Sequence, residues 1–114
     1  MPQLDGIHDI CQTRPMKMTH ALVQLAAVLM SAPHDKHWGY DLSKKSGVRS
    51  GAMYPRLRQM LEAGWLSDGW ETEVEGRPAR RYYEVTDDGL RELGALVARA
   101  GLDARFRGLK LGTA

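Results

Sequence analysis

The first segment with a regular hydrophobic pattern lies between residues 19 and 31. Its apolar side chains recur at steps of three and four, as on one face of an amphipathic helix: Leu22, Leu25, Ala26 and Leu29. Thr19 suits the N-cap position, and Pro33 closes the segment because the residue before a proline disfavours helical geometry. The pattern predicts a helix with one buried face.

Two more helices are predicted before residue 65. Residues 39–45 form a short one, which Gly47 ends in the left-handed conformation. We expect Ser50 to cap the next helix, and Gly64 to follow its end. Its apolar face carries Met53, Leu57, Met60 and Leu61. Pro55 counts against a regular start, because proline lacks a backbone N–H and crowds the preceding turn.

The opposite face of this third helix is polar. Tyr54, Arg58 and Glu62 follow one another at four-residue steps, so an aromatic hydroxyl and a guanidinium share one side. This face is available to contact a partner. On its spacing alone, Tyr54 could equally be a half-buried core aromatic.

After residue 64 the pattern becomes that of β-strands. Residues 70–74 and 80–86 are rich in β-branched and aromatic side chains, and the turn sequence 75–79 separates them. A two-stranded hairpin is therefore predicted, with Trp65 and Trp70 packing it onto the helices and Trp38 packing at the start of the 39–45 helix.

A fourth helix is expected after Thr86, whose hydroxyl can cap it. Asp87 and Asp88 would favour the positive end of its dipole. Its apolar stripe is Leu90, Leu93, Val97 and Ala100, and Gly101 ends it. The remaining residues, 102–114, form a basic tail with a few apolar side chains.

Composition limits the chain to a small single domain. It has 114 residues and a net charge of only +2, so bulk charge does not by itself point to nucleic acid. The charges are nevertheless segregated into two basic clusters, Arg49, Arg56 and Arg58, and Arg77, Arg80 and Arg81, with an acidic run of Glu71, Glu73 and Glu75.

We expect a cytoplasmic location. The chain contains a single cysteine, Cys11, and no pattern of a secretory signal. The longest apolar stretch, residues 21–30, is well short of the roughly 20 residues that a membrane-spanning helix needs.

Three helices followed by a hairpin predict a mostly α fold with a small β-hairpin, the winged helix-turn-helix. The blocks Gly39-Tyr40-Asp41-Leu42, Ser50 to Leu57, Gly64-Trp65-Leu66 and Gly76 to Leu90 together resemble the PadR family of transcriptional regulators. The resemblance runs from about Thr19 to about Ala100 and implies a homodimeric repressor on a palindromic operator in double-stranded DNA.

The resemblance also implies roles for particular segments. Residues 50–63 would be the recognition helix and residues 70–85 the wing. The expected DNA-binding residues are Arg49, Ser50, Gly51, Ala52, Tyr54, Arg58, Arg77 and Arg80. Some family members bind planar aromatic molecules at the dimer interface, so a small aromatic effector is conceivable, but no cofactor is implied.

We divide the chain into an N-terminal extension (1–17), a winged-helix DNA-binding domain (18–86), a C-terminal helix for dimer contact (87–101) and the basic tail (102–114). Leu4, Ile7 and Ile10 are spaced as in a short N-terminal helix, and Met18 is an alternative natural start. The family has helices after the wing for dimerisation, whereas Gly101 permits only a short one here.

Several competing interpretations follow from the same residues. The serines and histidines match no catalytic motif, so we do not expect an enzyme. His34, Asp35 and His37, with Cys11 and His8 or His20, do not have zinc-site spacing. The wing arginines could instead pair with Glu71, Glu73 or Glu75, and Arg49 and Arg58 could be solvated surface charges. The main alternative is a winged-helix module that binds a protein.

Overall fold

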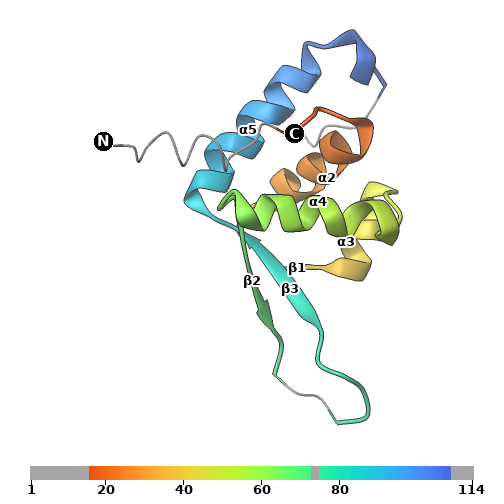
Figure 1. Cartoon of the computed structure of the whole chain (residues 1–114), viewed down its shortest axis with the longest axis vertical. Coiled ribbons are helices and arrows are strands. Elements are labelled where there is room, and N and C mark those ends of the chain that lie inside the picture. Colours follow the sequence, from red (N-terminus) through yellow and green to blue (C-terminus); the bar gives the residue numbers. More distant parts are fainter. Residues whose placement is uncertain (1–15, 73–74, 109–114) are drawn as a thin grey trace.

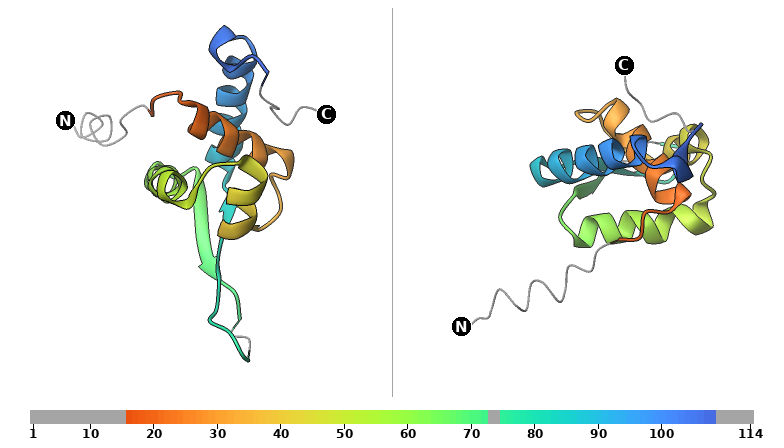
Figure 2. Two further views of the ribbon diagram at one scale, coloured as in Figure 1. Left: turned by 90° about the vertical axis from the view of Figure 1, so that its right-hand side faces the viewer. Right: turned by 90° about the horizontal axis from the view of Figure 1, so that it is seen from above.

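The computed structural model describes residues 16–72 and 75–108. Four helices form one body: α2 (His20–Ser31), α3 (Gly39–Ser46), α4 (Ser50–Glu62) and α5 (Asp87–Gly101). Strands β2 (Leu66–Trp70) and β3 (Arg81–Val85) form a hairpin that projects away from the helices (Figures 1 and 2). A two-residue strand β1 (His37–Trp38) and a short 3-10 helix η1 (Ala104–Phe106) complete the described elements.

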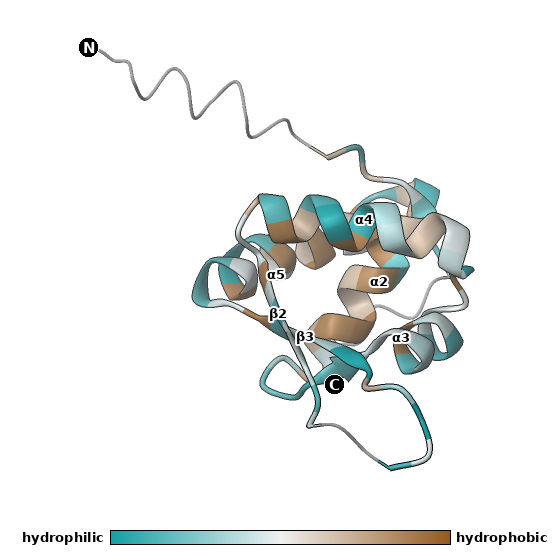
Figure 3. Ribbon diagram, turned by 60° about the horizontal axis from the view of Figure 1, so that its bottom comes forward, coloured by the Kyte–Doolittle hydropathy of each residue, from teal (hydrophilic) through white to brown (hydrophobic). Residues whose placement is uncertain are grey.

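Helix α2 lies at the centre of the body. Its N-cap is Thr19, whose hydroxyl accepts a hydrogen bond from the Leu22 N–H at 3.2 Å, as the sequence predicts. The largely hydrophobic α2 contacts α3, α4 and α5 (Figure 3). Because other helices surround it, α2 buries residues on more than the one face that its spacing suggests, including Val23 and Ala27.

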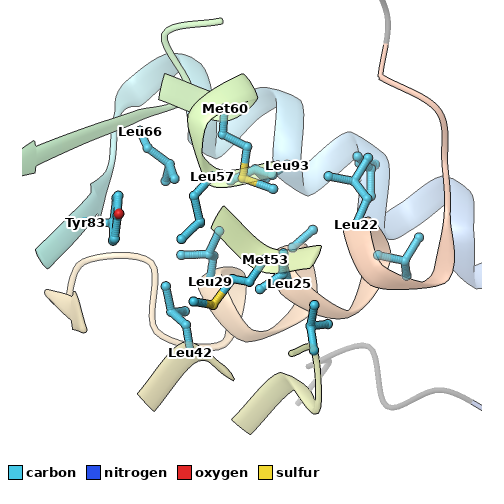
Figure 4. Packing of buried hydrophobic residues seen from close by; sticks show 14 of the residues in the cluster. Leu22, Leu25, Leu29, Leu42, Met53, Leu57, Met60, Leu66, Tyr83 and Leu93 are labelled. Carbon is cyan, nitrogen blue, oxygen red and sulfur yellow. The ribbon is translucent and has the colours of Figure 1, made fainter. Parts of the chain in front are cut away.

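The core contains buried residues from all four helices and from strands β2 and β3. Leu25 and Leu29 from α2 point toward Leu57 and Met53 from α4, and Tyr83 of β3 closes one end (Figure 4). All five side chains are almost completely buried. Since burying one such side chain contributes about 1.5–3 kcal/mol, this contact fixes α4 on the body.

The turn between α3 and α4 is held by hydrogen bonds. Gly47 has φ 75° and its N–H donates to the Ser43 carbonyl, confirming the predicted end of α3. The Ser43 hydroxyl donates to the Val48 carbonyl at 2.7 Å, and the Val48 N–H donates to the Ser46 hydroxyl oxygen at 3.1 Å. These bonds and the buried Val48 set the direction in which α4 leaves the turn.

The start of α4 differs from the prediction. Arg49, not Ser50, occupies the N-cap position, and no side chain caps the helix. Ser50 is already the first helical residue, because the Arg49 carbonyl accepts the N–H of Met53 at 2.8 Å. Pro55 lies inside an uninterrupted helix. Burial of one face of α4 offsets the cost of the proline.

The sheet has three strands in the order β1-β3-β2, one more than the hairpin predicted. Strand β1 pairs antiparallel with β3, His37 opposite Tyr83 and Trp38 opposite Tyr82. His37, expected in a polar loop, is buried, and its ring Nε2–H donates to the Ala32 carbonyl at 2.8 Å. This third strand ties the hairpin to the turn that precedes α3.

Strand β2 begins earlier than predicted, since it covers Leu66–Trp70 rather than residues 70–74. Trp70 is therefore at its outer end, with 65% of its surface exposed, and the expectation that it packs onto the helices is wrong. Trp65 does pack against the core, and Trp38 lies edge-on to Tyr82 with ring centroids 5.4 Å apart.

The base of the hairpin is joined to α5 at Thr86. As predicted, Thr86 caps α5, accepting the Gly89 N–H at 2.9 Å. Its hydroxyl also donates to the Gly64 carbonyl at 2.6 Å, and its N–H donates to the Trp65 carbonyl. Gly89 is required here, because a Cβ atom would collide with the Trp65 carbonyl oxygen.

The described residues after α5 fold back onto the body. Phe106 in η1 is buried, and its ring lies 5.0 Å from that of His20 in α2. This part of the predicted basic tail is thus anchored by an aromatic side chain. The predicted N-terminal helix around Leu4, Ile7 and Ile10 lies outside the described residues.

Candidate nucleic-acid interface

Helix α4 has one buried and one exposed face. Met53, Leu57 and Met60 are buried, whereas Tyr54 and Arg58 are exposed on the opposite side. Tyr54 has 48% of its surface exposed and is not part of the buried core cluster, so it is a half-exposed residue at the surface of the helix. The rigid attachment of the buried face allows the exposed face to be presented to a partner in a fixed orientation.

The N-terminal end of α4 is exposed at Arg49, Ser50 and Gly51. Because no side chain caps this end, its first backbone N–H groups are available to an acceptor such as a phosphate oxygen. Ala52 is different, since it packs partly against the core. Three of the four expected contact residues at this end are thus placed on the surface.

Tyr54 is positioned by a close approach to α3. A Cβ atom on Gly39 would lie 2.6 Å from the Tyr54 hydroxyl oxygen, so a larger residue at position 39 would require the tyrosine side chain to shift. The Tyr54 side chain thereby bridges the start of α3 and the exposed face of α4.

Arg77 near the tip of the wing is held by Glu71. The Arg77 guanidinium forms an ion pair with the Glu71 carboxylate and also donates to the Pro78 carbonyl at 3.3 Å. The hydrogen bonds that Arg77 donates to Glu71 lower the pKa of the Glu71 carboxyl, and the backbone N–H of Arg80 adds to the effect. The sequence analysis gave ion pairs with Glu71, Glu73 or Glu75 as an alternative role for the wing arginines. The structure contains such an ion pair at Glu71.

Arg80 and Arg81 each contact a carboxylate. The Arg80 backbone N–H donates to Glu71 at 3.0 Å, and its Nε lies 3.6 Å from the same carboxylate. Its guanidinium also lies 5.7 Å from the centre of the Trp38 ring. Arg81 donates to Asp68 through Nε at 2.7 Å, and this hydrogen bonding raises the pKa of Arg81.

Tyr54 and Arg80, although 26 positions apart in the sequence, line the same cleft between α4 and the wing. Its volume is about 360 Å³. Arg49 and Arg58 lie along α4, and Arg77 is farther out on the wing. The site consists of a helix face and a hairpin rather than one enclosed pocket.

Sequence reasoning missed two residues of this surface, Tyr40 and Trp70. Both are exposed and line the cleft. Tyr40 was present in the Gly39-Tyr40-Asp41-Leu42 block, but nothing in its spacing distinguished it from a core aromatic. Trp70 was assigned to the core because the first strand was placed four residues too late.

Other kinds of site find no support in the described part of the chain. No three His, Cys, Asp or Glu side chains come together there in a way that could hold a metal ion. Likewise, no helix in residues 16–72 and 75–108 is long and apolar enough to cross a membrane.

Comparison with known protein families connects this geometry to a function. Residues 28–95, more than half of the chain, match the Transcriptional regulator PadR-like family. The chain belongs to the PadR-like family. The resemblance and the winged-helix fold that the sequence predicted are thus confirmed, and the family consists of transcriptional regulators rather than enzymes.

Solved structures share the fold of this PadR-like regulator. A PadR family transcription regulator from hypervirulent Clostridium difficile R20291 superposes with a TM-score of 0.61 at 18% identity, over 74% of this chain and 90% of the other. The protein smu.1704 from Streptococcus mutans UA159 gives a TM-score of 0.60 at 26% identity, over 78% and 85%.

A PadR family transcriptional regulator from Eggerthella lenta DSM 2243 gives a TM-score of 0.58 at 24% identity, over 86% of this chain and 85% of the other. A search of curated proteins gave no match. The PadR-like regulator spans most of the length of these structural neighbours.

Proposed function

We propose that this PadR-like regulator binds double-stranded DNA sequence-specifically, with α4 in the major groove and the wing along the backbone. The observation that carries the proposal is the exposed face of α4, where Tyr54 and Arg58 lie opposite a fully buried face. A helix fixed in this way can present side chains to base edges, which specify sequence. The uncapped N-terminus at Ser50 and Gly51 would contact phosphate.

The proposal assigns the contacts by chemistry. Arg58 and Tyr54 would contact bases or phosphates in the groove, and Arg49 would contact the backbone beside the helix N-terminus. From the wing, Arg77 and Arg80 would contact the neighbouring backbone, in competition with Glu71. Ala52 would contribute only apolar contact, because it is partly buried.

We further propose a cytoplasmic homodimer that represses transcription by occupying a palindromic operator. Two recognition helices would then lie about 34 Å apart on one face of the duplex. Residues 18–86 would form the DNA-binding domain and residues 87–101 the dimer contact. Leu102, 91% exposed directly after α5, supports this assignment, because an exposed leucine is suited to burial against a partner. An aromatic effector at the interface would modulate DNA affinity.

The decisive experiment selects duplexes from a random pool with the purified protein. Binding to the enriched duplex is then titrated by fluorescence anisotropy at several salt concentrations, and the mass is measured by analytical ultracentrifugation. A dimer that neutralises roughly six to ten phosphates should lose about a thousandfold or more in affinity between about 50 and 200 mM salt. Absence of an enriched duplex, or salt-independent binding, would contradict the proposal.

One observation favours a second candidate, a module that binds a protein. The wing arginines are already paired with Glu71 and Asp68, which lowers the positive charge offered to DNA. If this candidate is correct, the folded protein enriches no duplex in the selection.

A further inference from the structure

Three of the four large hydrophobic side chains that are exposed in the described chain surround a single cleft. Tyr40 is 69% exposed, Tyr54 48% and Trp70 65%, and all three line the cleft between α3, α4 and the wing. Scattered exposed aromatics need no explanation, but a cluster of them on one face indicates a binding surface. The fourth such residue, Leu102, follows α5.

The cleft is built from elements that are firmly held. Tyr83, buried in β3, lies at its base, and burial raises the pKa of its hydroxyl. Trp38 is fixed edge-on to Tyr82 and lies under the Arg80 guanidinium. Gly39 leaves the space that the Tyr54 hydroxyl occupies. These three side chains are therefore held in place before an occupant binds, whereas Tyr40 and Trp70 are exposed.

The lining has an unusual chemistry. It consists of five aromatic residues, two arginines and one glycine, namely Trp38, Tyr40, Tyr54, Trp70, Tyr83, Arg80, Arg81 and Gly39. Every polar group among these side chains can donate a hydrogen bond, and no carboxylate is part of the lining, although Arg80 and Arg81 are also engaged by Glu71 and Asp68 beside it. A matching occupant has acceptor oxygens next to apolar C–H groups that can pack on an aromatic ring. A sugar-phosphate backbone has both.

We propose that this cleft binds the sugar-phosphate backbone of one DNA strand where it passes between α4 and the wing. Tyr40 and Trp70 are then DNA-contacting residues: the Tyr40 hydroxyl donates to a phosphate oxygen, and the Trp70 ring packs on a deoxyribose. This inference rests on the proposed function, since Tyr54 and Arg80 belong both to the cleft and to the expected DNA-binding surface.

The exposure of the cleft favours a strand of DNA over a small molecule. Sites for small ligands enclose most of the ligand surface, whereas Tyr40 and Trp70 each expose about two thirds of their own. A compact aromatic anion in this cleft would remain largely in water. A nucleic acid strand that already contacts α4 and the wing would cover both aromatic residues without further cost in association entropy.

The test compares Trp70→Ala and Tyr40→Phe with the wild type on two duplexes, the one enriched by selection and a shuffled duplex of equal length. Arg91→Ala, an exposed change on α5, is the control. Because backbone contacts carry no sequence information, each variant should lose the same factor on both duplexes. We expect about a tenfold loss for Trp70→Ala and about a threefold loss for Tyr40→Phe. Melting temperatures should not change, because both side chains are exposed.

Several outcomes would overturn the proposal. If both variants bind both duplexes as the wild type does while Arg58→Ala binds less tightly, the cleft does not contact DNA, although the proposed function stands. A loss confined to the enriched duplex would indicate base contacts instead. Unchanged DNA affinity with saturable binding of 2-naphthoate that Trp70→Ala abolishes would assign the cleft to a small aromatic anion. A wild type that binds neither duplex overturns both proposals.

Discussion

The two basic regions of the molecule differ in how their arginines are held. On α4, Arg49 and Arg58 form no ion pair with any residue in the described part of the chain. On the wing, Arg77 and Arg80 contact Glu71, and Arg81 contacts Asp68. The rigid helix thus presents unpaired charge, whereas the hairpin presents charge that is already compensated.

This difference has a physical reason. The α4 side chains start from a backbone that its buried face immobilises, so they need no further support. The wing is a two-stranded extension beyond the core, and its cross-strand ion pairs restrict the side chains near its tip. The cost is that, in the proposed complex, a phosphate would have to compete with Glu71 for Arg77 and Arg80. We therefore expect α4 to contribute more DNA affinity per arginine than the wing.

The largest effect is expected where the two regions are joined. Gly89→Ala should destabilise the protein by about 2–4 kcal/mol, because the new Cβ collides with the Trp65 backbone at the base of the wing. Thermal unfolding followed by circular dichroism measures this change.

The matched control is Gly94→Ala in the same helix, where a Cβ would meet only the Met30 methyl group at 3.7 Å. This change should be neutral or stabilising, since alanine favours helix by about 1 kcal/mol over glycine. Equal melting temperatures for the two variants would show that the close approach at Gly89 is not structurally important.

The next effect compares the two basic regions directly. Arg58→Ala should weaken binding to the enriched duplex by about 5- to 150-fold, the range expected for a contact worth about 1–3 kcal/mol. Arg77→Ala should weaken it by only about threefold, because part of the charge that it removes is already neutralised by Glu71. Anisotropy titrations at a single salt concentration give both values. A larger loss for Arg77→Ala would reverse the comparison.

The sequence predicted the elements that have a long hydrophobic pattern and missed those that have a short one. Helices α2, α4 and α5 have long apolar stripes, and their positions were predicted to within one or two residues. Strand β1 has only two residues, too few to show a period, so it was missed. Buried Phe106 was also missed, because nothing near it in the sequence indicates that it packs on α2.

The site shows the same limit. Helical periodicity placed Tyr54 and Arg58 on the exposed face of α4 correctly. The sequence offered Glu71, Glu73 and Glu75 as partners for the wing arginines, but it could not select Glu71 for Arg77, because that choice depends on how the hairpin folds beyond the ends of its strands. The cleft brings together Tyr40, Tyr54 and Trp70 from three elements, an arrangement that only tertiary packing creates.

A smaller effect is expected when the arginines of the wing are freed from their carboxylate, so that they are unpaired like those of α4. Glu71→Gln removes the carboxylate that holds Arg77 and Arg80, so DNA affinity should rise about threefold and the salt dependence should become steeper. The hydrogen bonds from Arg77 lower the pKa of Glu71 below its ordinary 4.5, so the carboxylate is ionised at neutral pH and the effect should not vary between about pH 6 and 8.

Asp88→Asn is the control for charge alone. It also removes one negative charge, but Asp88 pairs with Arg91 on α5 rather than with the wing. Its effect on DNA affinity should be smaller than that of Glu71→Gln. If Glu71→Gln instead weakens binding, the main role of Glu71 is to orient the arginines for DNA.

The smallest effect is expected for Ser50 at the start of α4, where the measurement distinguishes a side chain that caps the helix from one that contacts DNA. Ser50 does not cap the helix, so Ser50→Ala should change the free energy of unfolding by less than about 0.5 kcal/mol. Thr86→Ala removes a real cap on α5 and should cost about 1 kcal/mol in the same urea titration. If Ser50 instead donates to a phosphate, its replacement should weaken binding about twofold on enriched and shuffled duplexes alike. A stability loss as large as that of Thr86→Ala would mean that the Ser50 hydroxyl stabilises the fold, and that the N-terminus of α4 is less open to DNA than its geometry indicates.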